Sequence, residues 1–130
     1  MPAELYYLAL VSLLTALLWV PYGLHLIGAQ GLSVALGNRH DVRPFSPWAE
    51  RAKRAHENAV QGLVVFAAVV LAAHAAGVAN GVTVAAACLY FWARLAHYVV
   101  YVAGIIVVRT VVWTIAWICQ LVIAWQVIAS

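Results

Sequence analysis

Apolar residues run along this chain in four long blocks, and polar residues gather between them. A helix needs about 20 mainly apolar residues to cross a bilayer core of roughly 30 Å. The second block extends back through a polar half, because Ser46 followed by Pro47 is typical of an N-cap and a first-turn proline. The pattern predicts four membrane-spanning helices, over residues 5–27, 48–75, 82–103 and 107–129.

The connections between these helices predict their arrangement. Pro21 should kink or end the first helix, and the glycine- and proline-rich stretch Gly28–Pro47 reads as one long loop. The other connections, at Gly77–Gly81 and around Gly104, are short. Because short connections join antiparallel neighbours, we expect residues 1–130 to form a single domain, an all-α antiparallel four-helix transmembrane bundle.

Composition places the chain in the membrane class. It is 67% hydrophobic and 8% charged, with a mean hydropathy of +0.97, whereas soluble domains are about half apolar and about a quarter charged. The net charge of +3 is small and forms no basic patch, so nucleic acid is not expected as a partner. Cys88 and Cys119 lie in apolar runs without CxxC spacing, so we expect buried thiols and no metal site.

Basic residues predict the orientation. They fall between the first two helices and at the last connection, and neither chain end nor the Gly77–Gly81 turn carries Lys or Arg. By the positive-inside rule, the long first loop is expected in the cytoplasm and both termini outside. The basic residues concerned are Arg39, Arg43, Arg51, Lys53, Arg54 and Arg109.

The densest polar run is ERAKRAHENAVQ, residues 50–61, at the start of the second helix. Spacings of three and four place Arg51, Arg54, Asn58 and Gln61 on one helical stripe. This stripe should stand at the mouth of a membrane-buried space.

The third helix carries a second polar face, formed by Arg94, His97, Tyr98 and Tyr101. An arginine inside a span costs roughly several kcal/mol unless its side chain meets a cavity, a partner or lipid headgroups. Three readings of Arg94 stay open: a structural pair within the bundle, a ligand contact, and snorkelling to the interface. The chain has only four acids, Glu4, Asp41, Glu50 and Glu57, so arginines outnumber acids that could reach this half, which suggests an external anion.

The fourth helix opens with Arg109 and Thr110, followed on a nearby face by Trp113, Trp117 and Gln120. A cation beside a hydroxyl and helix N–H donors suits an anionic group. A plain interfacial anchor is the alternative reading.

Three motifs in order, ERAKRAHEN, ARLAHYVVY and an Arg-Thr pair, resemble the MAPEG family, membrane-associated proteins of eicosanoid and glutathione metabolism. The resemblance covers about residues 5–128 and looks closest to the bacterial branch, which suggests a bacterial inner membrane. The family includes microsomal glutathione transferases and the leukotriene and prostaglandin E synthases.

The resemblance implies a homotrimer with glutathione bound at the subunit interfaces. It matches glutathione-binding positions to Arg54 and Asn58 on the second helix and to Arg94, His97 and Tyr101 on the third. Arg109 matches the thiolate-stabilising arginine, with Thr110 as the hydroxyl beside it. Arg51, Gln61 and Trp113 complete the expected site. The sequence departs from the family pattern at Glu57, Ala59, Gln61 and Trp113, and it has no arginine at the end of the first helix.

The function that these residues favour is a glutathione transferase or peroxidase acting on a lipophilic small molecule drawn from the bilayer. A non-catalytic membrane protein that binds lipid headgroups or a partner helix is the alternative. A small multidrug transporter would need an acid deep in the first span, and residues 5–27 contain none.

Overall fold

The computed structural model describes residues 1–37 and 43–130. Within them the regular structure is helical, and the helices are α1 (Ala3–Leu17), α2 (Val20–Gln30), α3 (Leu32–Leu36), α4 (Pro47–Ala75), α5 (Gly81–Ala103) and α6 (Ile106–Ile128). With α1 and α2 taken together as Ala3–Gln30, this part of the chain has four helical stretches long and apolar enough to cross a membrane. The predicted all-α architecture with four spans is confirmed, whereas the homotrimer stays a prediction.

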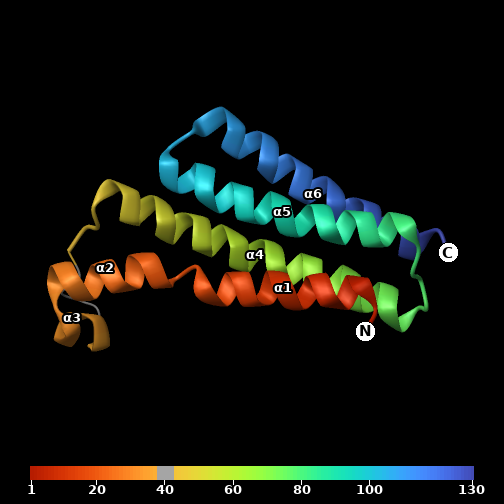
Figure 1. Cartoon of the computed structure of the whole chain (residues 1–130), viewed down its shortest axis with the longest axis horizontal. Coiled ribbons are helices and arrows are strands. Elements are labelled where there is room, and N and C mark those ends of the chain that lie inside the picture. Colours follow the sequence, from red (N-terminus) through yellow and green to blue (C-terminus); the bar gives the residue numbers. More distant parts are fainter. Residues whose placement is uncertain (38–42) are drawn as a thin grey trace.

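The long helices alternate in direction (Figure 1). Helix α5 packs against α1, α4 and α6, and α4 also packs against α1 and α6. Both termini and the α4–α5 turn lie at one end of the bundle, while α3, the start of α4 and the α5–α6 connection lie toward the other. The residues that form the polar stripes on α4, α5 and α6 therefore approach one another near that second end.

The first span is interrupted next to Pro21, as predicted. Helix α1 ends at Leu17, and Leu18 and Trp19 form a turn before α2 begins at Val20. Proline lacks a backbone N–H, and the first turn of a helix is where that donor has no intrahelical partner. Pro21 therefore starts a new helical segment instead of ending the span.

The prediction of one long loop from Gly28 to Pro47 is wrong in its first part. Helix α2 continues to Gln30, and α3 occupies Leu32–Leu36. Each glycine of this stretch was expected to interrupt regular structure, but of Gly28, Gly31 and Gly37 only Gly31 takes a positive φ, of 96°. Arg39 and Asp41, which were expected in this loop, lie outside the described residues.

Helix α4 begins as predicted, with Ser46 at the N-cap position and Pro47 first in the helix. The serine side chain makes no cap, however, and its Oγ lies 3.0 Å from His25 Nε2. The His25 ring also packs against Trp48, with ring centroids 4.9 Å apart. His25 therefore joins α2 to the start of α4, a structural role.

One face of α4 is a row of fully or nearly fully buried alanines, Ala49, Ala52, Ala55 and Ala59. Small side chains let helices approach closely, which is how membrane helices gain packing energy where lipid is as apolar as the protein. Farther along α4, Phe66 stacks on Tyr90 of α5 with ring centroids 4.0 Å apart. The alanine row and this aromatic pair fix where α4 lies.

Residue Thr83 joins α5 to α1 at the other end. Asn80 and Thr83 form a capping box at the start of α5, and the buried Thr83 hydroxyl donates to Glu4 Oε1 at 2.7 Å. Glu4, in the first turn of α1, is itself buried.

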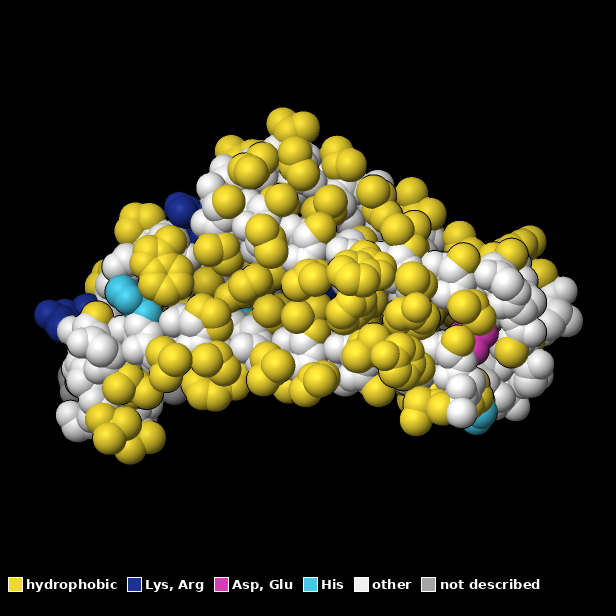
Figure 2. Space-filling model, in the orientation of Figure 1, with side chains coloured by type: hydrophobic (Ala, Val, Ile, Leu, Met, Phe, Trp, Pro, Cys, Tyr) yellow, Lys and Arg dark blue, Asp and Glu magenta, His cyan; other side chains and the backbone are white. Residues whose placement is uncertain are grey.

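Large apolar side chains cover the outside of the bundle. In Figure 2 they spread across the middle of the visible face, and Lys and Arg side chains stand at one end. The exposed residues include Val64, Trp92, Trp117 and Trp125. Such a surface is matched by lipid and not by water, so the chain is a multi-pass integral membrane protein.

Candidate functional site

Two adjoining cavities lie between α4, α5 and α6. The first has a volume of about 260 Å³ and the second of about 280 Å³. Asn58 and Trp113 line both, so the cavities share a wall or opening at these two side chains.

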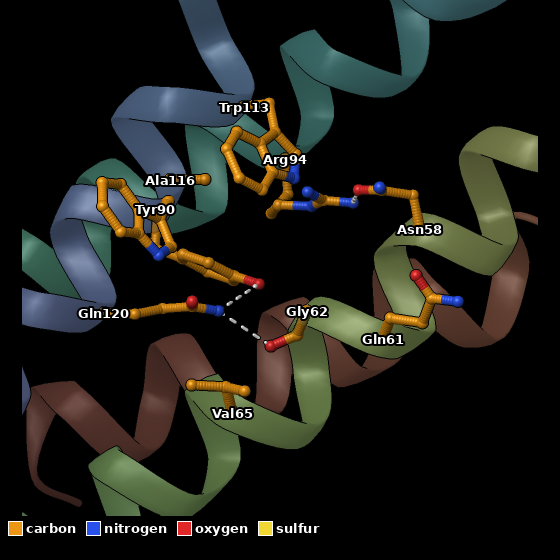
Figure 3. A pocket seen from close by; sticks show the side chains of 10 residues that line it. Asn58, Gln61, Gly62, Val65, Tyr90, Arg94, Trp113, Ala116 and Gln120 are labelled. Atoms are coloured by element: carbon orange, nitrogen blue, oxygen red, sulfur yellow. Dashed lines mark hydrogen bonds between the residues drawn. The ribbon is translucent and has the colours of Figure 1, made fainter. Parts of the chain in front are cut away.

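The first cavity has polar groups from α4, α5 and α6, and α6 adds two indole rings to its lining (Figure 3). Its polar side chains are Asn58, Gln61, Tyr90, Arg94 and Gln120. Trp113 and Trp117 of α6 stand parallel, with ring centroids 6.2 Å apart, and both indoles line the cavity. A ligand here would meet both hydrogen-bonding groups and flat apolar faces.

Arg94 is the buried charge of the first cavity. Its side chain is only 4% exposed, and Nη2 donates to Asn58 Oδ1 at 2.9 Å, while the buried Nε has no hydrogen-bond partner. A guanidinium keeps its charge in proteins, and an amide oxygen does not neutralise it. Arg94 therefore makes a structural pair within the bundle, with Asn58 and not with an acid among the described residues, and it also lines a cavity, whereas contact with a ligand stays a prediction.

A hydrogen-bonded group closes the deep end of the first cavity. Gln120 Nε2 lies 2.9 Å from the Gly62 carbonyl oxygen and 3.3 Å from the Tyr90 hydroxyl. Figure 3 shows these two contacts running from α6 to α4 and α5. Because three helices meet at this group, it fixes the width of the cavity.

The second cavity lies where α5 ends and α6 begins. It is lined by Asn58, His97, Tyr101, Arg109, Thr110 and Trp113. The Arg109 guanidinium sits over the Tyr101 ring, 4.6 Å from its centroid, and the His97 ring meets Tyr101 edge-on at 5.4 Å. Stacking on an aromatic face orients a guanidinium without neutralising it.

Helical periodicity explains how distant residues converge here. Tyr90, Arg94, His97 and Tyr101 follow at spacings of four, three and four on α5, so they share one face. Asn58 and Gly62 are four apart on α4 and present the matching face. Helix α6 begins at Ile106, which puts Arg109 and Thr110 in its first turns beside the end of α5.

The structure gathers eight of the ten predicted site residues around the two cavities, namely Asn58, Gln61, Arg94, His97, Tyr101, Arg109, Thr110 and Trp113. Arg51 and Arg54 do not line them. Arg51 Nε donates to the Val102 carbonyl at 2.9 Å, beside the end of α5. Arg54 is exposed and forms an ion pair with Glu50 at 3.3 Å.

Both cavities are cationic. Arg94 and Arg109 contribute positive charge, and no Asp or Glu is among the described residues that line either cavity. The Arg54–Glu50 pair is the single ion pair within residues 1–37 and 43–130. Two unneutralised guanidiniums facing joined cavities are suited to an anionic ligand.

Tyr90, Gly62 and Gln120 were not predicted as site residues. Tyr90 precedes Arg94 by four residues and Gly62 follows Asn58 by four, so extending each polar face by one turn would have found both. Gln120 is an isolated amide in an apolar helix, which is itself a sign of a buried partner.

A comparison with protein-family models matches residues 5–129 to the MAPEG family. No match was found among curated proteins or among solved structures. The match covers both cavities and, apart from the first two residues of the first span, all four spans. The chain therefore belongs to the MAPEG family.

Proposed function

We propose that this protein binds glutathione in the two joined cavities and uses it to conjugate or reduce lipophilic electrophiles. The observation that carries the proposal is the pair of unneutralised guanidiniums, Arg94 and Arg109, facing cavities lined without an acid in the described part of the chain. Glutathione carries two carboxylates and a thiol, so a cationic site of this kind fits it.

Arg109 is the residue that we assign to the sulfur. It lies over Tyr101 at the start of α6, at the edge of the second cavity, with Thr110 next in sequence. The thiolate is the nucleophile, and a free thiol is mostly protonated at neutral pH. A cation near the sulfur stabilises the thiolate, by about 1.4 kcal/mol for each unit by which the thiol pKa falls.

Arg94 and Asn58 are the residues that we assign to a carboxylate of the ligand. Arg94 already donates to Asn58, and its Nε is free to donate further. Gln61, His97, Tyr101 and Trp113 complete the walls. Arg54 lies one turn before Asn58 on α4, so we assign it to the rim, where it could meet a second carboxylate after releasing Glu50.

The second substrate would enter from the bilayer. Trp113 and Trp117 are 41% and 46% exposed on α6 and also line the first cavity, so they could guide an apolar molecule from the outside of the bundle to this site. In the conjugation step the thiolate sulfur bonds to the electrophilic carbon, and the leaving group or a ring-opened oxygen takes the electron pair. In a homotrimer, which we also propose, a neighbouring subunit would cover these cavities.

The test is formation of the thiolate on the purified protein. Adding about 1 mM glutathione should produce thiolate absorbance at about 240 nm and a heat of binding. Arg109→Ala should lose most of the absorbance while keeping a heat of binding, and Arg54→Ala is the matched control that should keep the absorbance at saturation. Absence of both signals in the unmodified protein would refute the proposal and favour binding of lipid headgroups.

A further inference from the structure

We infer that the site recognises its thiol by carboxylates alone, and that an acidic thiol without an ammonium group binds more tightly than glutathione. The inference rests on the proposed function, because it names the class of thiol that the same cavities accept. Glutathione carries a free ammonium beside one of its carboxylates, and the site must solvate, pair or repel that charge.

The walls of both cavities are positively charged. Arg94 faces the first cavity and Arg109 the second, and the described residues that line them include no carboxylate. Like charges repel more strongly in a protein cavity than in bulk water, because the effective dielectric there is lower. A ligand ammonium drawn into the first cavity with its carboxylate would therefore be repelled by Arg94.

The cavity walls offer a ligand ammonium few hydrogen-bond acceptors. A buried ammonium needs oxygen acceptors, and Asn58 Oδ1 already accepts from Arg94 Nη2. Gln120 uses its amide nitrogen on Gly62 and Tyr90. The amide oxygen of Gln120 and the amide of the exposed Gln61 remain as neutral acceptors, and a neutral oxygen is a weaker partner for a cation than a carboxylate.

The acids in the described part of the chain lie away from both cavities. Glu50 is engaged by Arg54, and Glu4 accepts from Thr83 at the opposite end of the bundle. Glu57 is exposed on α4 and lines neither cavity. Asp41 lies outside the described residues. A carboxylate therefore has cationic partners in this site, whereas an ammonium meets only neutral acceptors among the described walls.

Gln61 is the position at which an added acid would face the first cavity. It lies on the face of α4 that lines the first cavity, near Asn58 and facing the space beside Arg94 (Figure 3). A carboxylate at this position would supply the missing partner for an ammonium. Because Gln61 is exposed in the described chain, its replacement should leave the bundle folded.

The experiment compares two thiols on three proteins. The thiols are glutathione and its deamino analogue, in which hydrogen replaces the ammonium, and the proteins are the unmodified chain, Gln61→Glu and, as a neutral control of similar shape, Gln61→Met. Dissociation constants come from calorimetry at one pH and ionic strength. Thiolate absorbance checks that each thiol is ionised when it is bound.

The deamino analogue should bind the unmodified protein about tenfold more tightly than glutathione. Gln61→Glu should shift the ratio of the two constants toward glutathione by roughly tenfold or more, the effect of a charge-assisted hydrogen bond. Gln61→Met, which removes the amide without adding a charge, should not shift the ratio toward glutathione.

The results separate the inference from the function on which it rests. If both thiols bind and glutathione binds more tightly, the site recognises the ammonium, through an acid of a neighbouring copy for instance, and the inference is overturned while the proposed function stands. An unchanged ratio in Gln61→Glu also overturns it. If neither thiol binds, both the inference and the proposed function fail.

Discussion

Replacing Gly62 by alanine should distort the first cavity. A Cβ at this position would lie 2.8 Å from the Tyr90 hydroxyl and 3.8 Å from Arg94 Nη1. A contact of 2.8 Å is closer than such atoms approach in folded proteins, so the tyrosine or α4 must move. Tyr90 cannot move freely, because its ring is 1% exposed and stacks on Phe66 at 4.0 Å.

The size of the effect follows from two opposing contributions. Overpacking a well-packed site costs about 1–3 kcal/mol. Alanine is preferred to glycine inside a helix by about 1 kcal/mol, which offsets part of this cost. Gly28 of α2 is a matched control, since a Cβ there meets nothing within 4 Å. The difference in unfolding free energy between Gly28→Ala and Gly62→Ala should therefore be about 1–3 kcal/mol, with Gly62→Ala the less stable.

Denaturation in detergent, followed by tryptophan fluorescence, measures this difference for the two variants. A second change tests its cause: Tyr90→Phe removes the oxygen that the new methyl group would strike. The loss from Gly62→Ala should be smaller in the Tyr90→Phe background than in the unmodified protein, by about 1 kcal/mol or more. Equal stability of Gly62→Ala and Gly28→Ala, or additive effects of Gly62→Ala and Tyr90→Phe, would show that the packing argument is wrong.

Three further predictions concern chemistry, orientation and assembly. Arg109→Ala should lower the rate of conjugation of a model electrophile about tenfold or more, with a smaller effect on glutathione affinity, whereas Arg54→Ala should weaken glutathione binding more than it lowers the saturated rate. Steady-state kinetics with both variants checks this, and equal losses of rate and affinity would contradict it. In intact cells, an impermeant thiol reagent should label Ala79→Cys and spare Leu36→Cys, and the reverse pattern would invert the predicted orientation. Native mass measurement in detergent should give a trimer, and a stable monomer or dimer would refute that assembly.

The spans were predictable because a bilayer demands one thing of a helix, a long apolar stretch. The blocks that end near residues 75, 103 and 129 match helix ends at Ala75, Ala103 and Ile128 to within a residue. The region after Gly28 was not predictable in this way. A glycine is equally compatible with a helix and with a break, and what distinguishes Gly28 from Gly31 is backbone conformation that a single sequence does not reveal.

The site was partly predictable for a similar reason. Polar groups inside a span are costly, so Arg94, His97 and Asn58 stood out against an apolar background. Arg51 and Arg54 stood out equally, but Arg51 donates to the Val102 carbonyl and Arg54 is exposed and pairs with Glu50, so neither lines a cavity. Periodicity places residues on a face of a helix, whereas the distance of that face from its neighbours depends on packing that the pattern does not specify.

Packing and chemistry are combined in α4. Its alanine row, from Ala49 to Ala59, lies against neighbouring helices, and Asn58 and Gly62 present the polar face to the cavities. The same helix therefore sets the spacing of the bundle and the position of the groups that hold Arg94. Gly62 lies where the two roles meet, since its missing side chain makes room for the Tyr90 hydroxyl while its carbonyl accepts from Gln120. The width of the first cavity is consequently a packing property of three helices, and among the described residues that line it the charge offered to a ligand comes from Arg94.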